Sequence, residues 1–233
     1  IDDHSIPPED FEEKGELQSE CAKIVLKALY LARFARPDCY YSVNILAREV
    51  TKWNKACDKR LHRLESYLHH TKDHTMASWW GDKLDDCKLL QFTDASFAGE
   101  LRDSKSTSGG FLVLAGPNTW APLGWICKKQ GAVSHSSSEA EVIALDACTR
   151  MEAIPALQLW ELILDVLAPM PGKTKKADSG KKPKAGPPTM YDILANVDYV
   201  PCNIAKSSGR GQLIILEDNE AVIKMTIKCR SLN

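Results

Sequence analysis

Three strand-like runs follow one another in the middle of the chain and lead into one long helical stretch. The runs span 87–97, 110–115 and 119–127, and glycine, proline and asparagine residues between them supply the turns. Apolar residues then recur at helical spacing over 137–167, where Pro155 is expected to kink the helix or to divide it. Strands followed by a helix of this length predict an α/β fold with helices packed on a sheet.

A short apolar run and a final helix complete this pattern. Residues 213–216 predict a buried strand and 219–228 predict a helix. Before them lies a Lys/Pro/Gly-rich insert, 168–211, with six lysines within 173–184. The insert is either a solvated surface loop or an electrostatic arm for a nucleic-acid backbone. The order β-β-β-α-insert-β-α predicts a mixed sheet flanked by helices.

The first 80 residues have a different character. Residues 1–20 hold eight acids against one lysine, and we expect a flexible acidic lead-in there. Apolar spacing over 21–80 predicts three helices: one ending near Pro37, one with Val43, Leu46, Val50 and Trp53 inward, and one over 55–70. Four basic side chains on the last two helices either steer a nucleic-acid duplex or form a solvated face: Lys52, Lys55, Lys59 and Arg63.

Composition narrows the class of protein. The 233 residues, 44% of them hydrophobic, are enough for a sizeable core. The 30 Lys+Arg and 31 Asp+Glu nearly balance, so evidence for a nucleic-acid partner has to be local. The eight cysteines are scattered without a CxxC pair, which indicates reduced thiols. Without a signal-like start or a membrane-length apolar run, we expect a soluble intracellular protein, cytoplasmic or nuclear and not secreted. We also interpret the chain as a fragment of a longer protein.

Three acids are expected where strands and helices present them to one common point. Asp94 ends the first strand, Glu141 lies in the first turn of the long helix, and Asp218 follows the last strand. Each also has a local interpretation. Asp94 would form a turn, Glu141 would close a capping box with Ser138, and Asp218 would cap the final helix.

Taken together, the three acids predict a metal centre. Close carboxylates repel one another unless divalent cations neutralise them, and ligands that are all oxygen suit Mg²⁺ or Mn²⁺. Two such ions, roughly 3.5 to 4 Å apart, activate a water molecule and stabilise the leaving oxygen in phosphodiester hydrolysis. The residues therefore predict a two-metal hydrolase, unless all three acids are only helix caps and turn formers in a structural module.

Several motifs occur in the order typical of one family. They are FTDASFAGELRDSKSTSGG (92–110), KKQ (128–130), SSSEAEVIAL (136–145) and LEDNEAVIKM (216–225). This succession resembles the ribonuclease H domain of copia-type retrotransposons. Upstream, RPDCYYSVNILAREV (36–50) is similar to the segment that closes the reverse transcriptase in the same Pol polyprotein. The resemblance covers about 22–167 and 213–233 and leaves out the acidic start and the insert.

The resemblance implies a fold and a set of site residues. It implies an α/β ribonuclease H-like mixed sheet over 87–233, preceded by a helical reverse-transcriptase tail over 21–80. It maps the family's metal-binding acids onto Asp94, Glu141 and Asp218. Glu141 is chosen over Glu139 because an apolar residue and then x-Ala follow it, and Glu139 is expected to cap the helix or to lie on the surface.

The resemblance also implies an activity, which is hydrolysis of the RNA strand of RNA–DNA hybrids with Mg²⁺ or Mn²⁺ during reverse transcription. A fourth acid with a nearby histidine is expected after the last helix and has no counterpart in the sequence. The alternative is therefore a catalytically decayed nucleic-acid-binding remnant. Six residues flanking the acids in sequence are expected to contact phosphates: Lys105, Ser106, Thr107, Lys128, Lys129 and Gln130.

Two aromatic and histidine clusters remain. Trp79 and Trp80 either stack on bases or make core or linker contacts, and large aromatics are more often buried than not. Histidines 69, 70 and 74 lack an acid or cysteine at matching spacing, which disfavours a metal site.

Overall fold

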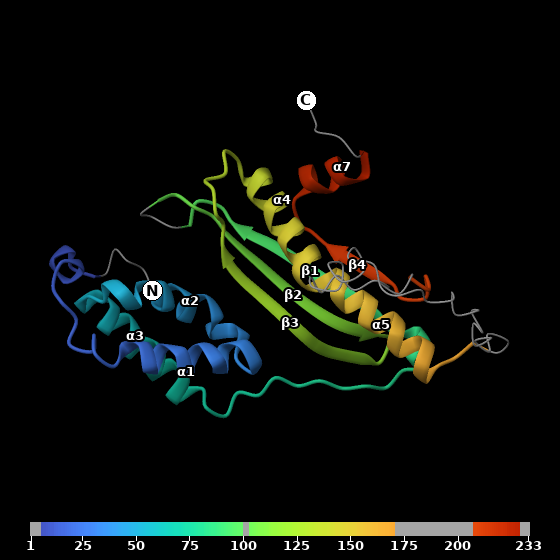
Figure 1. Cartoon of the computed structure of the whole chain (residues 1–233), viewed down its shortest axis with the longest axis horizontal. Coiled ribbons are helices and arrows are strands. Elements are labelled where there is room, and N and C mark those ends of the chain that lie inside the picture. The colour runs from blue at the N-terminus through green and yellow to red at the C-terminus, as the bar shows by residue number, and fades with distance from the viewer. Residues whose placement is uncertain (1–5, 100–102, 171–206, 229–233) are drawn as a thin grey trace, which may run out of the picture.

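The computed structural model describes residues 6–99, 103–170 and 207–228. They form a helical unit and a sheet unit, joined by an extended segment that runs beneath the sheet in Figure 1. The helical unit lies beside β3 at one edge of the sheet, and helices α4 and α5 run across the sheet. Most of the expected insert, including the lysines of 173–184, falls within 171–206 and lies outside the described residues.

The helical unit contains the three expected helices, α1 (Cys21–Phe34), α2 (Tyr40–Glu49) and α3 (Lys55–His70). Val25, Val43 and Leu61 are fully buried between them. Asn54 caps α3 by accepting a hydrogen bond from the Cys57 N–H (2.9 Å). Trp53, expected inside the second helix, follows it in extended conformation and is still buried. The apolar spacing therefore predicted these helices correctly, apart from the end of the second.

The acidic start differs from the expectation of a flexible lead-in. Over residues 6–20 it packs against α3, beginning with the 3₁₀ turn Pro8–Phe11. Asp10 is 2% exposed and pairs with both Lys55 and Lys59, while Glu13 pairs with Lys55 (2.7 Å). Opposite charges on the helix attract the acids, so two of the four basic side chains considered for steering are already neutralised within the chain.

The sheet unit is a four-stranded mixed sheet, as the pattern predicts. Its strands are β1 (Lys88–Ser96), β2 (Thr107–Gly116), β3 (Thr119–Lys129) and β4 (Leu213–Leu216), in the order β3-β2-β1-β4. β1 and β2 are antiparallel, as are β2 and β3, whereas β4 lies parallel to β1. Helices α4 (Ser137–Cys148), α5 (Ile154–Leu167) and α7 (Glu220–Lys228) complete the unit.

The long helix is divided before Pro155, as expected. The segment Thr149–Ala153 between α4 and α5 is a π-helical turn. Proline has no N–H to donate and its ring clashes with the carbonyl four residues earlier. The wider π turn provides the room, so α5 continues across the sheet in the direction of α4 (Figure 1).

Side chains alternate across β1. Leu89, Gln91, Thr93 and Ala95 are buried, whereas Asp94 and Ser96 on the opposite face are exposed. On β2, a side chain at Gly110 would overlap Cys148 Sγ, so glycine lets α4 approach the sheet closely. The expectation of a buried last strand is wrong: Ile214, Ile215 and Leu216 are 38–40% exposed, because β4 lies at the edge of the described sheet.

Trp79 and Trp80 make linker contacts. The backbone of Trp79 exchanges two hydrogen bonds with Trp120 on β3 (2.9 and 3.0 Å), and the Trp80 ring lies against Trp160 on α5 (6.1 Å between centroids). The segment between the two units is thereby attached to the sheet. In the described part of the chain, no helix is both long enough and apolar enough to cross a membrane.

Candidate metal centre

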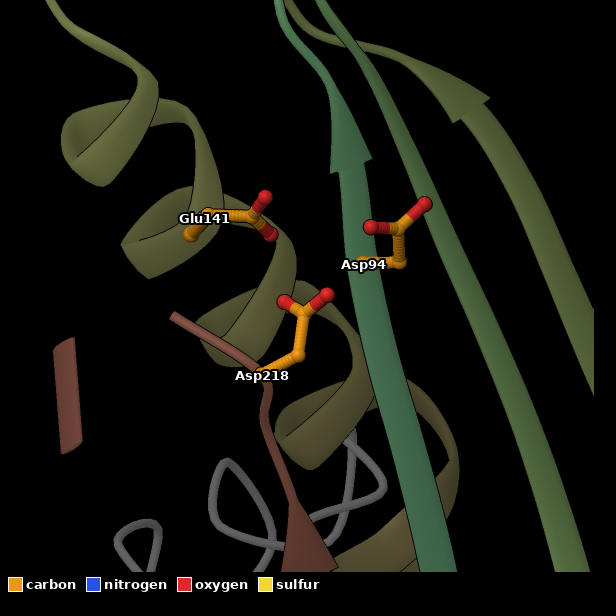
Figure 2. A group of neighbouring side chains, drawn as sticks. All are labelled: Asp94, Glu141 and Asp218. Atoms are coloured by element: carbon orange, nitrogen blue, oxygen red, sulfur yellow. The ribbon is translucent and has the colours of Figure 1, made fainter. Parts of the chain in front are cut away.

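The three predicted acids converge. Figure 2 shows Asp94 from β1, Glu141 from α4 and Asp218 from the segment after β4, with their carboxyl groups turned toward one another. One carboxylate oxygen from each lies within 4.8 Å of the others. Among the described residues this is the one such group of three or more His, Cys, Asp or Glu side chains. Residues 94, 141 and 218 are far apart in sequence, so the fold alone brings them together.

The local interpretations of these acids do not hold. Asp94 forms no turn, because it lies within β1 and pairs with Gly109. α4 is capped by Ser136, which accepts a hydrogen bond from the Glu139 N–H (3.1 Å), and not by Ser138 and Glu141. α7 is capped by Asn219, which accepts from the Val222 N–H (3.2 Å), and not by Asp218.

Glu139 has the capping role that the sequence allowed for it, since its carboxylate accepts a hydrogen bond from the His135 N–H (2.7 Å). Ser136, Glu139 and Asn219 therefore accept the hydrogen bonds from the free N–H groups at the starts of α4 and α7. The carboxylates of Asp94, Glu141 and Asp218 are left facing one another.

Electrostatics within the cluster are unfavourable. Glu141 is 7% exposed, and burial together with the negative charges of Glu217, Asp94 and Asp218 raises its pKa to about 7. A hydrogen bond from the Ala95 backbone acts in the opposite direction without compensating. The other carboxylate oxygen, Oε2, is buried and has no hydrogen-bond partner among the described residues. A buried acceptor without a partner is rare in folded proteins, which leaves a role for a cation.

The donor set fits a hard divalent cation. All three side chains offer carboxylate oxygens, the ligands that Mg²⁺ and Mn²⁺ prefer. The orphaned Oε2 of Glu141 points to the same conclusion, since a cation would satisfy it and would relieve the repulsion. A glycine, Gly109, faces Asp94 across the strand pair, so no side chain from β2 crowds that carboxylate.

Another acid, Glu217, lies beside the cluster, and it was not singled out from the sequence. It is not the fourth acid that the resemblance places after the last helix. Its carboxylate accepts hydrogen bonds from the Thr93 hydroxyl (2.8 Å) and the Asn219 N–H (3.2 Å). Thr93 lies next to Asp94 on β1, so this contact ties the end of β4 to β1 one residue before Asp218. Only its position beside Asp218 in LEDNE marked it in the sequence.

A second set of contacts holds the start of β4 and was also missed. Glu161 on α5 is 6% exposed and accepts hydrogen bonds from the Ser207 hydroxyl and from the N–H groups of Ser208 and Gly209 (2.9 to 3.1 Å). Arg210 pairs with Asp85 (2.6 Å) and donates to the Leu164 carbonyl (2.9 Å). These contacts set where β4 enters the sheet and therefore where Asp218 lies.

Of the six residues expected to contact phosphates, three are buried, and the three lysines are exposed or partly exposed. Ser106 and Gln130 are buried and bonded within the protein: Ser106 accepts from the Ala98 N–H, and Gln130 donates to Ser108 and to the Ala140 carbonyl. Thr107 is 9% exposed. Lys129 pairs with Asp103 (2.9 Å), and Lys105 donates to the Gly131 carbonyl (2.8 Å). Lys128 is exposed. The interior positions of Ser106 and Gln130 argue against phosphate contact for these two.

Comparison with known proteins identifies relatives of this chain. The chain is 37% identical over 128 residues to the Retrovirus-related Pol polyprotein from transposon RE2 of Arabidopsis thaliana, a match that covers 53% of this chain and 8% of that protein. It is 27% identical over 138 residues to the corresponding polyprotein from transposon TNT 1-94 of Nicotiana tabacum, covering 59% of this chain and 10% of that one. These matches fit a fragment of a retrovirus-related Pol polyprotein from a copia-type transposon.

A shorter protein is also similar to this chain. Secreted RxLR effector protein 161 of Plasmopara viticola is 30% identical over 122 residues, which are 52% of this chain and 81% of that protein. No family model matches the chain, and no solved structure matches it. The match spans only 8–10% of the length of the two Pol polyproteins described above.

Proposed function

We propose that this chain is the ribonuclease H-type portion of a retrotransposon Pol polyprotein and that it cuts the RNA strand of RNA–DNA hybrids. The observation that carries the proposal is the convergence of Asp94, Glu141 and Asp218 around a buried, unpartnered carboxylate oxygen. The strand order β3-β2-β1-β4, with β4 parallel to β1, is compatible with a ribonuclease H-like fold. Kinship to Pol polyproteins supports a role in reverse transcription.

Asp94, Glu141 and Asp218 would hold the metal, Mg²⁺ or Mn²⁺. When bound, two such ions supply a nucleophile from water and stabilise the leaving oxygen of a phosphodiester. Asp94 and Asp218 are exposed and would be accessible to a nucleic-acid backbone, whereas Glu141 is buried. Because burial and the neighbouring acids raise the pKa of Glu141 to about 7, a bound cation would favour its ionised form at neutral pH.

Hydrogen bonds at the start of α4 and at both ends of β4 position Glu141 and Asp218. The Ser136 cap begins α4 so that Glu141 falls one turn into the helix. The contact between Thr93 and Glu217 fixes the end of β4, and the contacts of Glu161 and Arg210 fix its start. Specificity for a hybrid requires recognition of 2′-hydroxyls on one strand and phosphates on both, and Lys128 is the exposed candidate for phosphate contact.

The deciding experiment incubates the chain with an end-labelled RNA–DNA hybrid in Mg²⁺ and in Mn²⁺. We expect cleavage of the RNA strand alone, and a loss of at least a hundredfold in Asp94→Asn. Asp146→Asn is the matched control, since Asp146 lies on the exposed side of α4 outside the cluster and should keep full activity. A hybrid that is bound and never cut, in either metal, would favour the decayed nucleic-acid-binding remnant instead.

A further inference from the structure

Glu217 lies on the α4 side of the sheet, next to the carboxylate cluster. It is half-buried and lines a cavity of about 260 Å³ together with Leu145 of α4, Ile215 of β4 and Val222 of α7. It does not belong to the group whose carboxylate oxygens lie within 4.8 Å of one another. Glu217 is therefore a neighbour of the proposed cation site and not one of its three converging acids.

The negative charge of Glu217 nevertheless acts on the cluster. After burial, three negative charges raise the pKa of Glu141, and the charge of Glu217 has a larger effect than those of Asp94 and Asp218. The cavity beside Glu217 is lined mostly by apolar side chains, and in the described part of the chain Glu217 is the one charged residue among them. A charge beside apolar side chains is poorly screened, so its effect extends to the cluster.

The hydrogen bonds of Glu217 do not require an acid. Its carboxylate accepts from the Thr93 hydroxyl (2.8 Å) and from the Asn219 N–H (3.2 Å). A glutamine could keep both contacts, because its oxygen accepts from the N–H and its NH₂ group donates to the hydroxyl. The Thr93 hydroxyl would then donate to the Leu216 carbonyl, which already lies 3.3 Å away. The hydrogen bonds therefore explain a polar side chain at position 217, but not a negative charge.

A bound cation would turn this charge from unfavourable to favourable. Two divalent cations carry four positive charges, whereas the ionised side chains of Asp94, Glu141 and Asp218 carry three negative ones. Glu217 would supply a fourth negative charge beside them. Residues that surround a metal site without binding the ion typically change its affinity by about 10- to 100-fold.

We propose that Glu217 strengthens cation binding at the cluster through its charge, without being a ligand itself. The inference rests on the proposed function, because the three converging acids supply the place where the cation binds. It gives Glu217 a role beyond its contact with Thr93, which is to balance the charge of the bound ions. Glu217 then has two opposite effects: it destabilises the protein without a cation and increases the affinity for one.

The test compares the binding of Mg²⁺ and of Mn²⁺ by the wild-type chain, Glu217→Gln and Thr93→Val, using isothermal titration calorimetry at pH 8. We expect Glu217→Gln to raise the dissociation constant about tenfold. Without divalent cations it should raise the midpoint of thermal unfolding by about 3 °C, because repulsion is relieved. Thr93→Val keeps the charge and loses one hydrogen bond, so it should lower that midpoint and weaken cation binding by no more than about threefold.

Glu220→Gln is the matched control. Glu220 also lies close to Asp218 in sequence, but its side chain is 78% exposed and pairs with Lys224 on α7. Removing this charge should leave both the cation affinity and the midpoint of thermal unfolding unchanged. The control separates the local effect of Glu217 from the net charge of the chain.

The outcomes separate this inference from the proposed function. If Glu217→Gln binds both cations as tightly as the wild-type chain, or if Thr93→Val weakens binding as much as Glu217→Gln does, the inference is overturned and the proposed function stands. A Glu217→Gln variant that is less stable than the wild type without cations, or that does not fold, also overturns it, because the carboxylate is then needed for the fold. If the wild-type chain binds neither cation, the inference and the proposed metal site fail together.

Discussion

Asp38 in the helical unit and the carboxylate cluster in the sheet unit have opposite electrostatic surroundings. In the helical unit, Asp38 accepts hydrogen bonds from the buried Arg36 guanidinium (2.7 Å) and from the Tyr67 hydroxyl, and the arginine holds its pKa near 2. In the sheet unit, Glu141 lies among other acids and its pKa rises to about 7. The pairing of Asp38 stabilises the helical unit, whereas the repulsion within the cluster destabilises the sheet unit.

This difference separates structural from functional carboxylates. A paired acid lowers the free energy of the folded state, and selection for stability alone explains it. A group of unpaired acids within 4.8 Å has the opposite effect unless a ligand neutralises it. The repulsion within the cluster is therefore the observation that motivates the proposed cation site.

Removing the Arg36 guanidinium from its pair with Asp38 should strongly destabilise the protein. Arg36 is 7% exposed, and besides Asp38 it donates to the carbonyl and the hydroxyl of Thr71 (3.0 and 2.7 Å). We expect Arg36→Met to lower the free energy of unfolding by about 2 kcal/mol, a value reduced for the partial exposure of Asp38. Urea denaturation followed by circular dichroism measures it. Arg33→Met, at an exposed position, should behave like the wild type, and equal effects would contradict the assigned role.

Neutralising an acid of the cluster should act in the other direction. The pKa of Glu141 is raised in the fold from 4.5 to about 7, so its stabilising contribution is present below pH 4.5 and is lost as pH rises through 7. We therefore expect Glu141→Gln to raise the free energy of unfolding by about 2 kcal/mol at pH 8 without divalent cations, and to leave it unchanged at pH 4.5. Glu65→Gln, on the exposed side of α3, should shift neither value. If Glu141→Gln instead lowered the free energy of unfolding at pH 8, repulsion would not be the main electrostatic effect at Glu141.

The affinity of the cluster for Mg²⁺ should depend on pH. Since a cation binds the ionised form of Glu141, affinity for Mg²⁺ should increase about tenfold between pH 6 and pH 8, as expected for a site with a pKa of about 7. Isothermal titration calorimetry at the two pH values measures the ratio. Glu141→Gln should bind more weakly and lose the pH dependence. A wild-type affinity that does not change with pH would show that Glu141 is not a ligand.

The smallest effect is expected for an exposed pair. Arg150 and Asp146 form a pair at i,i+4 on α4 (2.6 Å), with side chains 70% and 55% exposed. Solvent screens such pairs, so Arg150→Ala should leave the midpoint of urea denaturation unchanged within error. A large decrease in this midpoint would mean that exposed ion pairs, and not only buried ones, stabilise this protein.

Local patterns in the sequence were sufficient for several features. Apolar spacing predicted α1 and α3, and the effect of Pro155 was visible from its missing N–H. The motif order identified Asp94, Glu141 and Asp218, and the relatives agree with the family that the motifs indicate. These features depend on residues close in sequence or on residue type, which is why they can be recognised without a structure.

Other features depended on contacts between distant residues. Leu89 on β1 pairs with Leu213 on β4, and nothing local in either strand specifies that partner or the exposure of the edge. The pairing of Asp10 with α3 and the internal hydrogen bonds of Gln130 were missed for the same reason. The sequence by itself determined that Asp94, Glu141 and Asp218 carry the carboxylates of the proposed cation site. Only the tertiary structure decided that the three meet and that Glu217 lies beside them, because burial and charge pairing depend on which surfaces face one another.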